Sequence, residues 1–238
     1  YIMEKKFILT DEFVVNVFGV KLFRIKCVKA FKYAKEGELG GFIEKEENLE
    51  QSGDAWVSGD AWVYGNARVY GDARVYGNAW VYGNARVYGD ARVYGNAQVY
   101  GNAWVSGNAR VSGNAQVYGN AWVYGNARVS GNALVSGDAW VYGDAQVYGN
   151  ARVSGNALVS GDAKIESDDS HCGFDCFGSA NRHTHAYLTK DNKVEITCGC
   201  FRGSIEEFEK KVEETHSGTV YEKEYKAIIN VIKIKFGL

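Results

Sequence analysis

The 238-residue sequence contains no proline and no run of 18 consecutive apolar residues. A membrane-spanning helix needs about 20 such residues, so we predict neither a membrane span nor a membrane partner. The formal net charge is only −2, which argues against a strongly basic nucleic-acid binder. The segment after Met3 lacks the apolar core of a signal peptide, and the cysteines number five, which is odd. We therefore predict reduced thiols in a cytoplasmic protein.

Residues 55–162 lack histidine, cysteine, lysine and threonine altogether. They consist instead of one hexad, Ala-x-Val-(Tyr or Ser)-Gly-(Asn or Asp), repeated eighteen times without a change of phase. Ala and Val lie two residues apart and point to the same side of an extended strand. Gly, Asn and Asp tolerate the left-handed backbone that turns require. Each hexad therefore predicts a short strand with Ala and Val inside, followed by a corner.

The outward residues recur every 18 positions, which predicts a three-sided coil of three hexads. The recurring sets are tryptophan at 104, 122 and 140, arginine at 74, 92, 110 and 128, and tyrosine at 64, 82, 100 and 118. On such a coil each set becomes a vertical column. Coils should lie about 4.8 Å apart, so six coils give a rod roughly 29 Å long.

The column of Trp104, Trp122 and Trp140 predicts an exposed aromatic face. Exposed apolar patches are typical of partner surfaces, so we favour a homo-oligomer, or binding of a protein partner, on this face. The alternative is that the aromatic rings only cover one another down the face.

The arginine column has two interpretations. Its guanidinium groups could follow a phosphate backbone. However, Asp72 and Asp90 lie two residues before Arg74 and Arg92, and we expect them to pair with these arginines. Without a clear basic excess, we favour solvated, partly paired arginines over nucleic-acid binding.

The pairs Ala55–Val57 and Ala61–Val63, and every later pair, follow the small-x-aliphatic pattern of the hexapeptide-repeat proteins. The chain resembles that family, which implies a left-handed parallel β-helix. More narrowly, GELGGFIE at 37–44 and NLEQSGDAWV at 48–57 resemble YdcK-like proteins of bacteria and prophages. The family fold serves acyltransferases and scaffolds alike, so the resemblance bears on the fold more than on function.

We expect three parts: an N-terminal β cap at 1–47, the β-helix at 48–166 and a C-terminal α+β domain at 167–238. Alternating apolar residues predict a strand pair in the cap, with Cys27 as a buried structural thiol. In the C-terminal part, residues 183–189 and 193–197 predict a hairpin. The segments 204–207 and 219–222 are capping boxes, each opening an amphipathic helix. Both end units should cover bare coil edges.

The cysteines and histidines after residue 170 raise the question of zinc. His183 and His185 would share one face of a strand, as would Cys198 and Cys200, so a hairpin could bring four soft ligands together. The spacings match no standard zinc motif. We therefore expect no cofactor by default, with buried thiols and surface histidines, and keep a structural zinc ion as the alternative.

A second candidate is an anion site at the start of the helix after residue 203. Gly203 and Ser204 enter a helix N-terminus, where free N–H groups favour negative charge. Arg202 is adjacent, and Arg182, His183 and His185 would join if the hairpin packs there. A small phosphorylated ligand would suit such a site. The alternative is that Ser204 only caps the helix.

From these features we predict a non-enzymatic scaffold or binding protein, with no catalytic residues. The prophage resemblance suggests a host-interaction or anti-defence role, for example sequestration of a nucleotide-like ligand. The rival hypothesis is a hexapeptide-type acyltransferase with His183 or His185 as its base, since no histidine occurs before His171.

Overall fold

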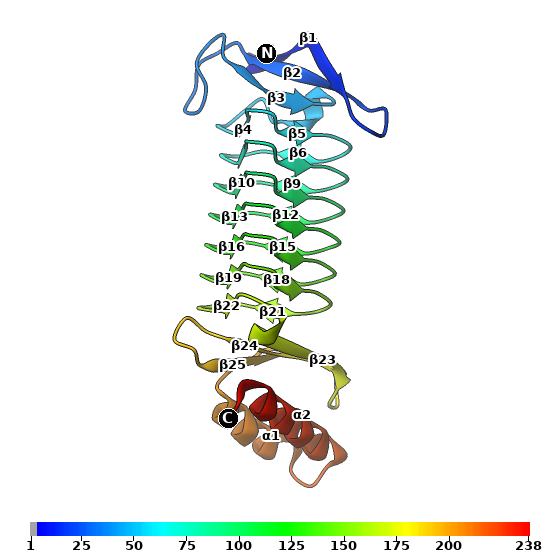
Figure 1. The fold of residues 1–238 in the computed structure, drawn as a ribbon, viewed down its shortest axis with the longest axis vertical. Coiled ribbons are helices and arrows are strands. Elements are labelled where there is room, and N and C mark those ends of the chain that lie inside the picture. Colours follow the sequence, from blue (N-terminus) through cyan, green and yellow to red (C-terminus); the bar gives the residue numbers. More distant parts are fainter. Residues whose placement is uncertain (1–3) are drawn as a thin grey trace.

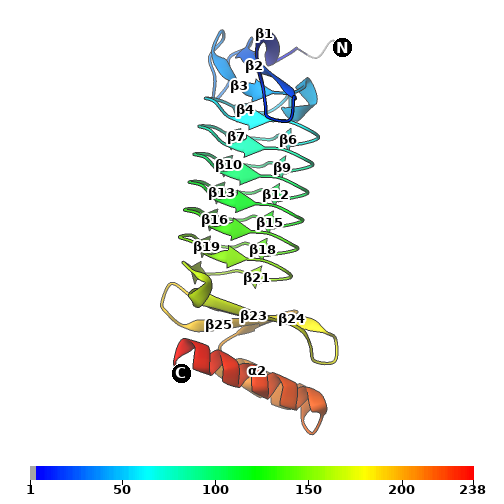
Figure 2. The ribbon, with the colours of Figure 1, turned by 45° about the vertical axis from the view of Figure 1, so that its right-hand side comes forward.

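A straight rod of parallel β-coils lies between two end units in the computed structural model, which describes residues 4–238 (Figures 1 and 2). The first three residues of the expected N-terminal cap therefore lie outside the description. The predicted architecture is confirmed: a solenoid with 18 residues per coil, a small N-terminal β sheet, and a C-terminal unit of sheet and two helices. The left hand of the coil stays a prediction from the resemblance.

Each coil contributes one two-residue strand to each of three parallel sheets, so strands 18 residues apart pair in register. The first sheet contains β5 (Trp62–Val63), β8 (Trp80–Val81), β11 (Gln98–Val99), β14 (Gln116–Val117), β17 (Leu134–Val135) and β20 (Arg152–Val153). The second contains β4 (Trp56–Val57), β7 (Arg74–Val75), β10 (Arg92–Val93), β13 (Arg110–Val111), β16 (Arg128–Val129), β19 (Gln146–Val147) and β22 (Lys164–Ile165). The third contains β6 (Arg68–Val69), β9 (Arg86–Val87), β12 (Trp104–Val105), β15 (Trp122–Val123), β18 (Trp140–Val141) and β21 (Leu158–Val159).

The interior of the rod is filled by the alanine and valine of each hexad, which are buried as predicted. The corners need glycine for two reasons. Gly119, for example, has a φ of 71°, and a Cβ at this residue would lie 2.9 Å from the amide nitrogen of Gly137 on the next coil. On the outer side of the corners, asparagine side chains donate to one another from coil to coil, as Asn84 Nδ2 does to Asn102 Oδ1 at 3.0 Å.

The N-terminal cap consists of β1 (Phe7–Val15), β2 (Lys21–Cys27), β3 (Leu39–Ile43) and the 3-10 helix η1 (Glu46–Asn48). β1 and β2 are antiparallel, and β3 pairs in parallel with β5, so the cap sheet continues directly into the first solenoid sheet. Cys27 is fully buried, as predicted. Ile43 and Leu49 enter the same core as the coil valines, so the cap closes the open end of the rod.

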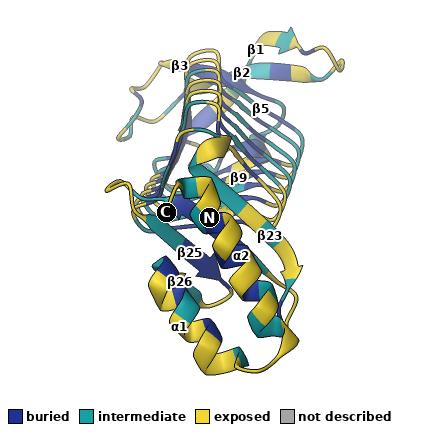
Figure 3. Ribbon diagram, turned by 60° about the horizontal axis from the view of Figure 1, so that its bottom comes forward, coloured by how far each residue is buried: buried dark blue, intermediate teal, exposed yellow. Residues whose placement is uncertain are grey.

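The C-terminal unit contains a four-stranded antiparallel sheet of β23 (His171–Phe177), β24 (Arg182–Leu188), β25 (Val194–Cys198) and β26 (Phe201–Gly203), preceded by the 3-10 helix η2 (Asp168–Ser170). The predicted hairpin is β24–β25, whereas β23 and β26 were not predicted. Two helices, α1 (Ile205–His216) and α2 (Val220–Phe236), pack on the face of the sheet away from the coils (Figures 1 and 3). Ser204 and Glu207 form the predicted capping box of α1.

Candidate functional site

The three tryptophans of the third sheet lie in register and stack on one another. The ring centroids are 4.8 Å apart for Trp104–Trp122 and 5.0 Å apart for Trp122–Trp140, and both pairs are within 3° of parallel. Tyr124 and Tyr142 form a second stacked pair beside them, at 5.0 Å. The exposed fraction is largest for Trp140, at 38%. The predicted column is confirmed, and we call these five residues the Trp face.

On its three coils the Trp face carries no charged side chain, and Ser106 fills the sixth outward position. Arg86 continues the tryptophan column on the coil before Trp104, and its guanidinium group lies over the Trp104 ring at 5.0 Å. The corners on either side of it are mostly asparagine: Asn102, Asn120 and Asp138 before the strands, and Asn108, Asn126 and Asp144 after them. An aromatic centre with a polar rim is the usual anatomy of a protein–protein interface. Ring stacking and ring exposure therefore coexist on this face, although the sequence had presented them as alternatives.

The four predicted arginines also form a column, because Arg74, Arg92, Arg110 and Arg128 are successive partners in the second sheet. The expected ion pairs with Asp72 and Asp90 are absent from the ion pairs of residues 4–238, so that prediction is wrong. The guanidinium group of Arg74 lies instead over the rings of Tyr33 and Tyr76, at 4.7 and 5.0 Å. Aromatic contact thus replaces the expected pairing at the first arginine of the column.

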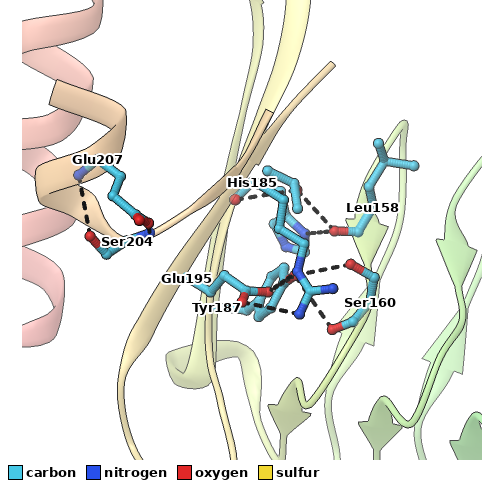
Figure 4. Close-up of polar contacts among 9 residues, drawn as sticks. Leu158, Ser160, His185, Tyr187, Glu195, Ser204 and Glu207 are labelled. Carbon is cyan, nitrogen blue, oxygen red and sulfur yellow. Dashed lines mark hydrogen bonds and ion pairs between the residues drawn. The ribbon is translucent and has the colours of Figure 1, made fainter. Parts of the chain in front are cut away.

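The C-terminal sheet is joined to the last coil by a seam of buried polar contacts (Figure 4). Thr197 Oγ1 donates to the carbonyl oxygen of Leu158 at 3.0 Å, and His185 Nδ1 lies 3.3 Å from the same oxygen. Tyr187, which is fully buried, donates to Glu195 Oε1 at 2.7 Å and lies 3.4 Å from Ser160 Oγ. These contacts fix the sheet to the coil end.

His185 is the central imidazole of the seam, and its hydrogen bonds define its tautomer. Since Nδ1 faces a carbonyl oxygen, it carries the proton, and Nε2 accepts from His171 Nδ1 at 2.9 Å. Burial lowers the pKa of His185 to about 3, and the neighbouring His171 acts in the same direction. His183 Nδ1 lies 2.6 Å from Asp175 Oδ1. The sequence missed His171 as a partner because β23 was not predicted.

The six residues of the predicted anion site do not come together. The register of β24 places His183 and His185 on the coil face of the sheet and Arg182 on the helix face. Arg202 forms two hydrogen bonds with Glu195, at 2.7 and 3.1 Å. At the helix start, Glu207 Oε2 accepts from the Ser204 backbone N–H at 2.8 Å and lies against Gly203. The carboxylate of this chain therefore occupies the position proposed for an anion.

The predicted zinc ligands are separated in the same way. Cys198 is paired with Thr184, so it lies on the helix face, opposite His183 and His185, and contacts the hydroxyl of Tyr225. Cys200 is exposed in the turn that follows. Within residues 4–238 no group of three or more histidine, cysteine or acidic side chains is arranged to hold a metal ion.

Comparison with known proteins gives one family. The repeat family described as YdcK Beta solenoid repeat matches residues 61–77, 67–83, 79–95, 85–101, 97–113, 115–128, 127–143 and 145–161. No curated protein matches the chain. In the part of the chain that the structure describes, no helix is long and apolar enough to cross a membrane. The matched repeats coincide with the parallel coils, so the solenoid of this chain is a YdcK-like β-solenoid repeat rod.

Proposed function

We propose that this protein is a non-enzymatic scaffold whose rod associates with a second copy of the chain through the Trp face. The observation that carries the proposal is the stacked, uncharged ladder of Trp104, Trp122 and Trp140 on an open side of the rod. Stacking between coils already orders these side chains, so little rotamer freedom remains to be lost on binding.

A second copy is the occupant that the geometry favours, because both partners then share the same coil spacing. Aligned antiparallel about a two-fold axis, each ladder meets an identical ladder, which is the requirement of an isologous contact. The Trp face brings no like charges together when it meets itself. The arginine column, from Arg74 to Arg128, would repel its own copy.

The non-enzymatic part of the proposal rests on the two candidate bases of an acyltransferase. His185 is only 1% exposed and both of its ring nitrogens are engaged. His183 is hydrogen-bonded to Asp175, and its Nε2 is buried. Neither histidine therefore presents a free and accessible ring nitrogen that could take a proton from a substrate. Acyl-CoA binding measured by calorimetry is the check, and a saturable heat of binding would contradict this part of the proposal.

Sedimentation velocity across a wide protein concentration range tests self-association. We expect a monomer–dimer equilibrium for the native chain and a monomer for the triple variant Trp104→Gln, Trp122→Gln, Trp140→Gln. Glutamine already occupies the same hexad position at 98, 116 and 146, so the coils accept it. The control is Arg110→Gln with Arg128→Gln, which should dimerise at least as well as the native chain. A native chain that stays monomeric at the highest concentration would sink the proposal.

The wider role is proposed from the prophage resemblance alone. A rod that associates with itself and carries a compact domain at its end would suit interaction with host components, including an anti-defence role. The version with a nucleotide held at the start of α1 loses support, because Glu207 fills that position.

A further inference from the structure

A polar groove lies where the cap meets the first regular coils of the third sheet. Two cavities, of about 510 and 630 Å³, share the lining residues Glu47, Arg68 and Arg86. The groove exists because the coil above β6 is irregular. There Asn48 is fully buried and donates to the carbonyl oxygens of Gly65 and Ala67. The side chain of Asn48 therefore points inward, and no outward side chain covers Arg68 on the side of the cap. We call this gap at the start of the third sheet the open step.

Two arginine residues are neighbours at this step. Arg68 and Arg86 are direct partners on β6 and β9, and both are exposed. Among residues 4–238, neither side chain takes part in an ion pair or a hydrogen bond, although the guanidinium group of Arg86 lies over the Trp104 ring at 5.0 Å. Like charges directly opposite one another destabilise a sheet, and an anion between them would remove that repulsion. Guanidinium groups donate in a fork that matches the oxygens of phosphate or carboxylate.

An aromatic ring lies beside the two arginines. Tyr70 stacks on Tyr88 with centroids 4.9 Å apart, so one face of its ring is covered. Tyr70 lines the first cavity together with Leu49 and Glu50, which are aligned with Val69 and Tyr70 one coil toward the N-terminus. A planar group entering here would continue the stack as one more ring at the normal spacing.

The acidic side chains of the groove define the polarity of that planar group. Glu46 is paired with Lys5 at 2.6 Å, and Glu50 Oε2 accepts from the Gly71 N–H at 2.9 Å, which leaves its second oxygen free. Glu47 lines both cavities. Carboxylates accept hydrogen bonds only, so the ring must present N–H donors. The same carboxylates would repel a long polyanion, which excludes a nucleic-acid strand.

We propose that this groove binds a free nucleotide with an amino-bearing base. The phosphate lies between Arg68 and Arg86, the base stacks on Tyr70, and its amino group donates to Glu47 or Glu50. The side chains of Lys45, Asn66 and Asn84 line the second cavity and are placed to contact the sugar and any further phosphate. This site adjoins the Trp face, since Arg86 is the strand partner of Trp104.

Isothermal titration calorimetry of the full chain with GMP, AMP, UMP and pyrophosphate tests the assignment. We expect GMP and AMP to bind more tightly than UMP, which has no amino group, and pyrophosphate to bind most weakly. Equal affinity for pyrophosphate and the nucleotides would overturn the role of Tyr70. If none of the four probes binds, the proposed site is wrong.

Variants that imitate other positions of the same solenoid locate the site without disturbing the coil. Arg68→Gln with Arg86→Gln introduces the residue of positions 98 and 116, and Tyr70→Ser introduces that of position 106. We expect each variant to weaken GMP binding by roughly tenfold or more. The control Arg110→Gln lies on another sheet and should leave the affinity unchanged. Equal affinity in the native chain and the double arginine variant would contradict the proposal.

Discussion

At the scale of single residues, the corner glycines set the spacing of the whole rod. Each has a left-handed backbone, and at several of them, such as Gly119, a Cβ would also lie less than 3.0 Å from the backbone of the next coil. Valine and alanine fill the interior, but their replacement changes only packing. A change of corner glycine alters backbone conformation and coil spacing together.

We predict that Gly119→Ala destabilises the solenoid by about 1–3 kcal/mol, because the left-handed conformation is strained for alanine and its Cβ meets the backbone of Gly137. Urea unfolding followed by circular dichroism measures the loss. Ser112→Ala, at a half-buried outward position, is the matched control and should change little. Equal midpoints for the two variants would refute this account of the corner.

Sequence periodicity predicted these residue-scale features because every hexad repeats the same local chemistry. The columns at 104, 122 and 140 and at 74, 92, 110 and 128 followed from counting alone. The pairing of Asp72 with Arg74 did not, since proximity in sequence says nothing of the aromatic ring of Tyr33, which comes from the cap. The open step at Arg68 was likewise hidden, because it depends on how the irregular segment around Asn48 folds.

At the scale of elements, the seam between the last coil and the C-terminal sheet decides where the chemistry-bearing residues go. Sequence alternation placed His183 and His185 together correctly, but it could not say that this face is turned toward Leu158 and away from the helices. The proposed anion and zinc sets each mixed residues from both faces. A hairpin identifies which residues share a face, and only tertiary packing says what each face meets.

The buried histidines of the seam predict a stability that falls in acid. Above its ordinary pKa of 6.5, His185 is neutral in both the folded and the unfolded chain. As the pH drops below that value, His185 becomes protonated in the unfolded chain, whereas in the folded chain it stays neutral down to about pH 3. The pKa of His171 is also lowered by burial, so its contribution has the same sign. Each such histidine removes up to about 1.4 kcal/mol of unfolding free energy per pH unit.

Urea unfolding between about pH 7 and pH 5 measures this dependence on acidification. We expect the unfolding free energy to decline through that window, and a shallower decline in His185→Gln. Ser112→Ala, on the rod and without a titratable side chain, is the control and should keep the native slope. An unfolding free energy independent of pH would contradict the neutral, buried state of His185.

At the scale of the whole molecule, the two end units prevent the rod from extending itself. The cap sheet supplies a parallel neighbour, β3, to the first sheet at one end. At the other end, Ala163 bridges Thr189, and Lys190 N donates to the carbonyl oxygen of Asp162. Unpaired strand edges at either end would offer N–H and C=O groups to another chain.

We predict that a chain ending after Glu166 associates end to end, because removal of the C-terminal unit exposes the edges of the last coil. Electron microscopy and size-exclusion chromatography measure this association. The triple Trp→Gln substitution serves as the background, so that side-to-side contact through the Trp face does not interfere. A truncated chain that remains monomeric and as stable as the full chain would show that the end units are dispensable for solubility.

The unbroken phase of the hexads makes length and orientation separately adjustable. Insertion of three hexads would move the C-terminal unit about 4.8 Å farther from the cap and return every column to its place. Insertion of one hexad would instead rotate that unit by roughly a third of a turn about the long axis and transfer the aromatic rungs beyond it to a neighbouring side. Adding residues in multiples of eighteen would therefore change only the length of the rod. Adding one or two hexads would also change the orientation of the C-terminal unit about the long axis.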